Sequence, residues 1–188
     1  PIANSAGIPV LNAIDINSPE TLQLVTKWKP DVIFCFGWSQ LIKQPLLELP
    51  QLGVIGYHPA ALPYNRRRHP LIWALVLGLT ETASTFFFID KGVDSGDIIS
   101  QQIVLISSQD NARTLYDRIT TTSIDQIRDF VPRLISGNFI RTPQSNTIAN
   151  VWRKRYRLDG QIDWRMPAES IHNLVRGLSH PYPGADFN

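Results

Sequence analysis

Short apolar runs alternate with helical segments along most of this chain, and this alternation constrains the fold more than any other sequence feature. Residues 31–36 form an almost uninterrupted apolar run, which is typical of a strand buried on both faces of a sheet. Further strands are predicted at residues 8–11, 53–57, 82–89 and 98–106, and helices at residues 18–29, 40–49, 69–79 and 110–135. The alternation predicts an α/β fold, Rossmann-like and doubly wound, with a mostly parallel sheet.

Two of the predicted helices carry clear signals. Ser18 followed by Pro19 indicates a helix start, because Ser caps an unpaired backbone N–H and Pro fits the first helical turn. The long helix at 110–135 is predicted to bury one apolar face, formed by Leu115, Ile119, Ile127, Val131 and Leu134.

The sequence changes character after residue 137. A polar run containing Pro143 is followed by a basic cluster at 153–157 and a short predicted helix from about 167 to 178. We therefore expect an α/β domain at residues 1–137, and a linker with the start of a small C-terminal module at residues 138–188.

The composition excludes several classes of protein. With 18 basic and 16 acidic residues the net charge is only +2, which does not favour a nucleic-acid partner. No apolar run approaches the roughly 20 residues of a membrane helix, so no membrane partner is expected. The single cysteine, Cys35, has apolar neighbours and is expected to be a buried thiol in a cytoplasmic protein. The four histidines lack the paired spacing of metal ligands, so no metal is expected. The oligomeric state stays open, a homodimer included.

A histidine and an aspartate follow two of the predicted strands. His58 ends the strand at 53–57, and Asp94 lies in the Gly-flanked turn 92–97 after the strand at 82–89. Strand ends of an α/β sheet often assemble an active site, and this pair suits general acid–base or oxyanion chemistry. The same residues also suit a plain interpretation, in which His58 is a hydrogen-bonded strand-end residue and Asp94 a turn former.

Basic and aromatic residues near this pair also have two interpretations. The run of three arginines at 66–68 is either a solvated loop or a clamp for phosphate oxygens. Trp38 and Trp73 fit either a core or the wall of a pocket for a flat ring. The chain has neither a Gly-x-Ser-x-Gly elbow nor a Gly-rich phosphate loop.

These residues resemble the folate-dependent formyltransferases, which move a formyl group from 10-formyltetrahydrofolate to an amine. The matching features, in order, are His58-Pro59 at a strand end, Leu62-Pro63 with the basic loop, and the run 93–97, Val-Asp-Ser-Gly-Asp. The resemblance covers nearly the whole chain and identifies residues 1–137 as the catalytic domain. The first strand–helix–strand portion of the family has no counterpart, so a domain truncated at its N-terminus is expected.

The resemblance implies roles for individual residues. His58 would assist collapse of the tetrahedral intermediate and stabilise its oxyanion, while Asp94 would tune His58 and help to take the proton of the amine. The formyl donor, 10-formyltetrahydrofolate, would bind through Phe36, Gly37, Trp38, Leu41, Ile89, Asp90 and Val93. The acceptor would bind through Arg66, Arg67, Arg68, Trp73 and Tyr182.

Two positions depart from the family pattern. The family usually has Asn two residues before the histidine, where this chain has Gly56. The absent carboxamide would hold the formyl oxygen, and loss of such a donor typically costs about 3–4 kcal/mol. A backbone N–H or a water could replace it, and the hydrolase domain of formyltetrahydrofolate dehydrogenase also lacks this Asn. Arg67 replaces the Gly that usually follows the first Arg of the basic loop.

Two stretches favour a nucleotide-linked amino sugar as the acceptor, as in polysaccharide biosynthesis. Residues 68–73 and the tail at 171–185 are most similar to nucleotide-sugar N-formyltransferases. Weak overall basicity argues against tRNA, which needs a broad positive surface. Three alternatives stay open: a methionyl-tRNA formyltransferase, a 10-formyltetrahydrofolate hydrolase, and a non-catalytic relative that binds folate or nucleotide.

Overall fold

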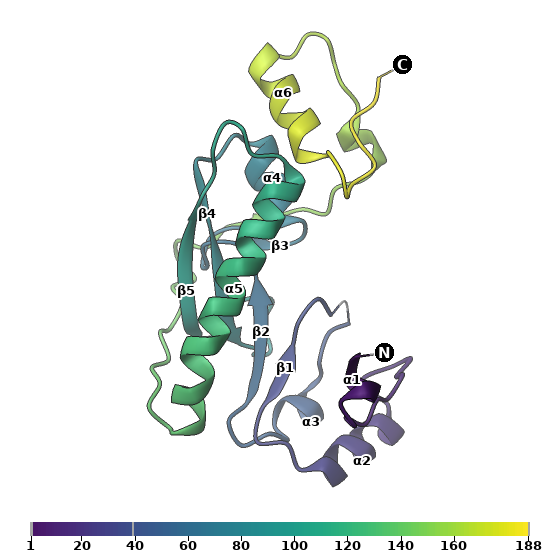
Figure 1. Ribbon diagram of the computed structural model, residues 1–188, viewed down its shortest axis with the longest axis vertical. Helices are drawn as coiled ribbons and strands as arrows, with labels where there is room; N and C mark the ends of the chain where they lie inside the picture. Colours follow the sequence, from purple (N-terminus) through teal and green to yellow (C-terminus); the bar gives the residue numbers. More distant parts are fainter. Residues whose placement is uncertain (1, 39, 188) are drawn as a thin grey trace. The chain divides into compact units, whose positions relative to one another are not determined.

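The computed structural model describes residues 2–38 and 40–187 of the 188-residue chain. The chain forms two compact units, residues 1–54 and residues 55–188 (Figure 1). The division lies inside the domain predicted at 1–137, and the boundary predicted at residue 137 stays a prediction.

Unit 1 contains short elements. They are α1 (Ile2–Ser5), α2 (Pro19–Trp28), β1 (Ile33–Cys35) and α3 (Gln44–Leu47), with the first residue of β2 (Val54–His58) at its end. The helix start predicted at Ser18 is confirmed, because its hydroxyl oxygen accepts a hydrogen bond of 3.2 Å from the backbone N–H of Thr21.

Three expectations for unit 1 are wrong. Residues 8–11 do not form a strand. Of the helix predicted at 40–49, only α3 forms. Pro45 lies in the first turn of α3, and a proline cannot continue a helix that starts earlier. The strand at 31–36 is not buried on both faces: Phe34 is 39% exposed and Cys35 only partly buried, although burial still raises the pKa of the thiol. An apolar run reports the type of side chain, whereas burial also needs a second layer packed against it.

The long strands β4 (Glu81–Phe88) and β5 (Ile98–Leu105) of unit 2 pair in an antiparallel manner with their neighbours in the main sheet. β2 pairs with β4, and β4 pairs with β5. The prediction of a mostly parallel sheet is therefore wrong for these strands. Only residues 89–97 connect β4 to β5, and parallel neighbours need a crossover of about a dozen residues or more.

The long helix of unit 2, α5 (Ala112–Ile135), packs along this sheet (Figure 1). Its start is capped by Asn111, whose side-chain oxygen accepts hydrogen bonds from the backbone N–H groups of Arg113 and Thr114. The buried residues of α5 are Ala112, Leu115, Ile119, Gln126, Phe130 and Leu134. Leu115, Ile119 and Leu134 were predicted, whereas Ile127 and Val131 are only partly buried.

Two shorter helices of unit 2 lie close to their predicted positions. They are α4 (Pro70–Val76) and α6 (Ala168–Gly177), which share an apolar cluster that includes Ile72, Leu174 and Leu178. In the described part of the chain no helix has the length and apolarity needed to cross a membrane.

Three short elements of unit 2 were not predicted. β3 (Arg66–Arg67) and β6 (Val151–Trp152) form a two-stranded parallel sheet, and η1 (Arg157–Gly160) is a short 3-10 helix. Strands of two residues show no side-chain alternation, so the sequence carries no periodic signal for them.

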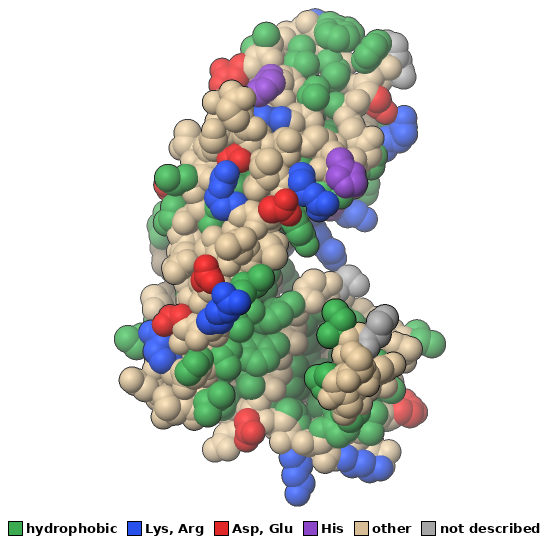
Figure 2. All heavy atoms as spheres, in the orientation of Figure 1, with side chains coloured by type: hydrophobic (Ala, Val, Ile, Leu, Met, Phe, Trp, Pro, Cys, Tyr) green, Lys and Arg blue, Asp and Glu red, His purple; other side chains and the backbone are tan. Residues whose placement is uncertain are grey.

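Charged side chains of both signs are interspersed on the face drawn in Figure 2. Along α5, Arg128 pairs with Asp125 and Arg133 with Asp129, one helical turn apart. The basic residues of this helix are therefore largely compensated by neighbouring acids.

Candidate active site

His58 lies at the end of β2 and is only 5% exposed. Its ring nitrogen Nε2 lies 2.8 Å from the backbone carbonyl oxygen of Asn65. Because a carbonyl oxygen can only accept a hydrogen bond, Nε2 must carry a proton. Nδ1 is therefore the ring nitrogen that can gain or lose a proton during a reaction.

Asp94 faces that second nitrogen. Its Oδ2 lies 3.9 Å from Nδ1 of His58 and accepts a hydrogen bond of 2.8 Å from the backbone N–H of Arg67. The separation is too long for a hydrogen bond but short enough for a carboxylate to stabilise a charged ring. The prediction that these two residues lie together is confirmed by the geometry.

The turn between β4 and β5 brings Asp94 close to His58. In the antiparallel register Phe88, the end of β4, lies opposite Ile55, so residues 89–97 fold back along β2 before Asp94 reaches His58. The turn closes tightly at Gly96, where an added Cβ would lie 1.8 Å from the carbonyl oxygen of Phe88. Asp94 itself has a left-handed backbone with φ of 54°, a conformation that Asp tolerates better than most residues.

This pair can accept and stabilise a proton. A neutral His58 with its proton on Nε2 can take a second proton at Nδ1, and the resulting cation faces the Asp94 carboxylate. The charged ring can then stabilise a nearby oxyanion or return the proton to a leaving group.

Gly56 precedes His58 by two residues and has no free space above it. An added Cβ would lie 2.9 Å from Cγ1 of Ile89 and 3.0 Å from Cζ of Phe87. Apolar side chains therefore occupy the place at which a side chain of residue 56 would stand.

Comparison with known proteins identifies the family of this chain. The formyl transferase family model matches residues 9–128, and the model of the formyl transferase C-terminal domain matches residues 156–188. The chain belongs to the formyl transferase family. It is thus an enzyme of folate-dependent formyl transfer.

Solved structures share its fold. A sugar N-formyltransferase from a Shewanella species has a TM-score of 0.82 at 19% identity, covering 99% of this chain and 74% of that chain. A methionyl-tRNA formyltransferase from Clostridium thermocellum has a TM-score of 0.75 at 22% identity, covering 96% and 75%. A formyltransferase from Anoxybacillus kamchatkensis has a TM-score of 0.64 at 25% identity, covering 79% and 76%. These likenesses establish the α/β fold of the formyltransferases.

In this formyltransferase the three loop arginines differ in their surroundings. Arg66 is 8% exposed, and its guanidinium donates hydrogen bonds of 2.9 Å to Asn146 and to Gln144. It thus holds another segment of the chain, contrary to the expectation that it faces the acceptor. Arg67 and Arg68 are exposed. Arg67 has φ of 80°, a backbone region that favours glycine, which accounts for the Gly usual in the family at this position.

Trp73, on α4, lies beneath a basic cluster. The guanidinium of Arg155 sits 4.6 Å from its ring centroid, and its Nε1 donates a 2.9 Å hydrogen bond to the carbonyl oxygen of Arg153. His69 precedes α4, and burial together with the nearby cations lowers its pKa. Arg68, Lys154 and Arg155 therefore place positive charge near His69, whereas Arg153 is paired with Asp159.

Tyr182 has a different environment. It is partly buried and packs against the apolar clusters that hold α4 and α6. Burial raises the pKa of its phenol. The structure thus gives this predicted acceptor residue a packing role.

The predicted folate residues are divided between the two units. Those of unit 1 are exposed and follow β1: Phe36, Gly37, Trp38 and Leu41. In unit 2, Ile89, Asp90 and Val93 lie in the turn after β4. The Asp90 carboxylate accepts hydrogen bonds from the backbone N–H of Gly92 and the hydroxyl of Ser95, so it shapes the turn.

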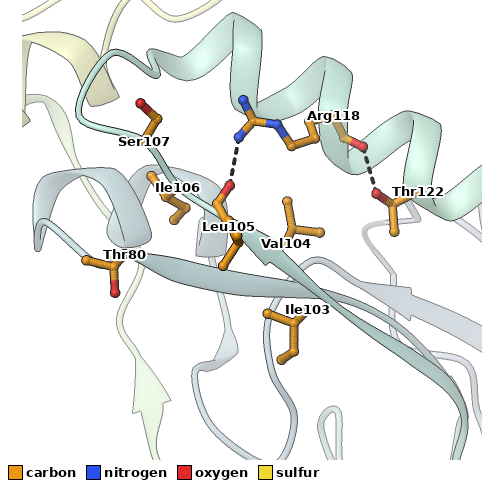
Figure 3. A pocket seen from close by; sticks show the side chains of 8 residues that line it. All are labelled: Thr80, Ile103, Val104, Leu105, Ile106, Ser107, Arg118 and Thr122. Atoms are coloured by element: carbon orange, nitrogen blue, oxygen red, sulfur yellow. Dashed lines mark hydrogen bonds between the residues drawn. The ribbon is translucent and has the colours of Figure 1, made fainter.

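A hollow beside β5 lies apart from these residues (Figure 3). It is lined by Thr80, Ile103, Val104, Leu105, Ile106, Ser107, Arg118 and Thr122. Within the described ranges no three His, Cys, Asp or Glu side chains come close enough together to hold a metal ion.

The polar run after α5 contributes residues that sequence reasoning missed. The side-chain oxygen of Asn150 accepts a 2.5 Å hydrogen bond from the backbone N–H of Asn65, and Gln144 and Asn146 accept from Arg66. The density of Asn and Gln between residues 144 and 150 was the available signal, but it is equally typical of a solvated linker.

Proposed function

We propose that this enzyme transfers the formyl group of 10-formyltetrahydrofolate to the amine of a nucleotide-linked amino sugar. The observation that carries the proposal is the buried His58, with its Nε2 proton fixed by Asn65 and its Nδ1 facing the Asp94 carboxylate.

The proposed chemistry uses this pair at each proton transfer. The amine nitrogen attacks the formyl carbon, and the carbonyl oxygen gains a negative charge that the protonated His58 stabilises. The proton lost by the amine passes to the carboxylate of Asp94. The bond from carbon to the folate nitrogen then breaks, and that nitrogen takes a proton from His58 as the formamide forms.

Each unit offers donor-binding residues of its own, unit 1 in the segment after β1 and unit 2 in the turn after β4. The exposed rings of Phe36 and Trp38 offer apolar surface for a pterin. At the turn, Ile89 is half-buried and Val93 is 52% exposed, so both apolar side chains and nearby backbone are available to a flat ring.

A nucleotide-linked sugar is favoured as the acceptor by the local charge. Arg67 and Arg68 are exposed beside the site, and Lys154 lies close enough to His69 to affect its pKa. A diphosphate needs only a few such cations, whereas tRNA needs a broad basic surface. The similar A. kamchatkensis enzyme was solved with a UDP-linked formamido sugar and tetrahydrofolate.

A second candidate function is hydrolysis of 10-formyltetrahydrofolate. The observation that favours it is Gly56, because the apolar side chain of Ile89 fills the place of the carboxamide that the family usually has there. Formate release that does not depend on an amine would support hydrolysis.

The test is a formyl-transfer assay with a panel of nucleotide-linked amino sugars. Native enzyme is compared with His58→Ala and Asp94→Ala, and initiator methionyl-tRNA and water serve as the other acceptors. Transfer to a sugar that disappears in both variants supports the proposal. Transfer to tRNA alone, or formate release alone, would reject the sugar as acceptor.

A further inference from the structure

The polar segment after α5 returns to the active site and contacts both of its loops. Residue 142 forms a bridge with Ile98, with backbone hydrogen bonds of 2.8 and 2.9 Å. β6, at 151–152, then pairs with β3. We call residues 142–152 the strap, because these two backbone pairings hold it at both ends.

Gln144 is the strap residue that joins the two loops. Its Nε2 donates hydrogen bonds of 3.0 Å to the carbonyl oxygen of Asp94 and 2.6 Å to that of Gly96. Its Oε1 accepts a hydrogen bond of 2.9 Å from Arg66. One amide therefore connects the turn that carries Asp94 to the loop that carries Arg66.

The loop of residues 65–67 orients both His58 and Asp94 through its backbone. Arg66 is only 8% exposed, and its guanidinium also donates a hydrogen bond to the side-chain oxygen of Asn146. The next backbone N–H, that of Arg67, donates to the Asp94 carboxylate. Asn65, which precedes Arg66, supplies the carbonyl that fixes the His58 ring. Both groups that orient the His58–Asp94 pair thus flank the residue that Gln144 holds.

Asp94 needs such support. Its backbone is left-handed, and the carboxylate stands 3.9 Å from His58 without a direct hydrogen bond to the ring. A displacement of about 1 Å in such a site can lower the rate about 100-fold.

We propose that Gln144 is a positioning residue, which sets the Asp94 carboxylate opposite Nδ1 of His58 through its contacts with the Asp94 turn. The inference rests on the proposed roles of His58 and Asp94. Gln144 touches neither of their reacting atoms, so it acts through Asp94.

The kinetic test is a double-mutant cycle in the full chain. Gln144→Ala is expected to lower kcat about 10- to 100-fold with a smaller change in the KM of either substrate, because Gln144 bonds to backbone carbonyls of the Asp94 turn and to Arg66, not to the exposed side chains proposed to bind substrate. In an Asp94→Asn background the same substitution should have almost no further effect on kcat. A purely structural role would instead lower kcat by the same factor in both backgrounds and would overturn the proposal.

Two further variants separate the contacts. Gln144→Glu keeps an acceptor for Arg66 but loses the donor to the Asp94 turn, so we expect it to be impaired like Gln144→Ala. Native kcat in Gln144→Glu would contradict a role through Asp94. Gln109→Ala is the matched control, because Gln109 is exposed and lies outside the site.

A measurement that needs no substrate tests the positioning role of Gln144 independently of the proposed function. Hydrogen exchange at the Arg67 amide reports directly on the Asp94 carboxylate that accepts its proton. Exchange should become faster in Gln144→Ala and in Asp94→Ala, but not in Gln109→Ala. Unchanged exchange in Gln144→Ala would overturn the inference even in an active enzyme. Faster exchange with no formyl transfer to any sugar would uphold it while rejecting the proposed acceptor.

Discussion

Replacement of Gly56 by Asn tests whether the missing family carboxamide can be restored. The new Cβ would lie 2.9 Å from Cγ1 and 3.1 Å from Cδ1 of Ile89, and 3.0 Å from Cζ of Phe87. Ordinary carbon contacts are about 3.5–4.0 Å, so the neighbours must move by roughly half an ångström or more. Overpacking of this kind typically costs about 1–3 kcal/mol.

We therefore expect Gly56→Asn to unfold at a lower denaturant concentration than the native protein. In thermal unfolding the same loss corresponds to roughly 2–4 °C for each kcal/mol. Adding Ile89→Ala removes the two overlapping Ile89 atoms and leaves only the contact with Phe87, so the double variant should lose less stability than the sum of the two single losses. Gly137→Asn is the control for crowding, because nothing lies within 4 Å of a Cβ there, and any loss it shows reports backbone strain at its φ of 74°, which Asn tolerates better than most residues.

The activity of the double variant completes this test. If Asn fits in the space left by Ile89, its amide can donate to the formyl oxygen, and formyl transfer should exceed that of Ile89→Ala alone. Native stability in Gly56→Asn, or additive losses in the double variant, would refute the steric argument.

The remaining predictions concern the reacting pair, the ion pair between the buried Asp110 and the exposed Arg118, and the basic loop. His58→Ala and Asp94→Asn should each lower kcat for formyl transfer about 10²- to 10⁴-fold in steady-state assays run below their unfolding transitions, and His58→Ala should unfold earlier because His58 is buried and bonded to Asn65; native kcat in either would remove that residue from the mechanism. Hydrogen bonds from Arg118 lower the pKa of Asp110 to about 2, so this carboxylate stabilises the fold above its unfolded pKa and the stabilisation is lost as the pH falls from about 4 toward 2. Thermal unfolding across this range should show the loss, and Arg118→Leu should flatten it; an equally steep pH dependence in that variant would contradict the assignment. Arg68→Ala should raise the KM for a nucleotide-linked sugar but not for the folate, and an unchanged sugar KM would exclude Arg68 from phosphate binding.

Local sequence was sufficient for most elements of the fold. Capping by Ser18 marks a helix start because its side chain bonds to a backbone N–H only three residues away, whereas the cap of α5 at Asn111 was seen only in the structure. The apolar runs that became β2, β4 and β5 also stand out, since strand-forming side chains are clustered there. His58 and Asp94 were identifiable because each occupies the end of a recognisable element.

The tertiary structure decided how those elements are combined. Strand direction depends on pairing between distant segments, so the antiparallel course of β4 and the return of its turn to His58 were not visible in any local run. Gln126 is buried because its amide donates to Ser84 and Ser100 on the sheet, partners that apolar periodicity cannot reveal. Arg66 likewise became a support for the site once Gln144 and Asn146 accepted its hydrogen bonds. Sequence patterns report interactions within a few residues, whereas burial and hydrogen bonding between remote segments arise only when the chain is folded.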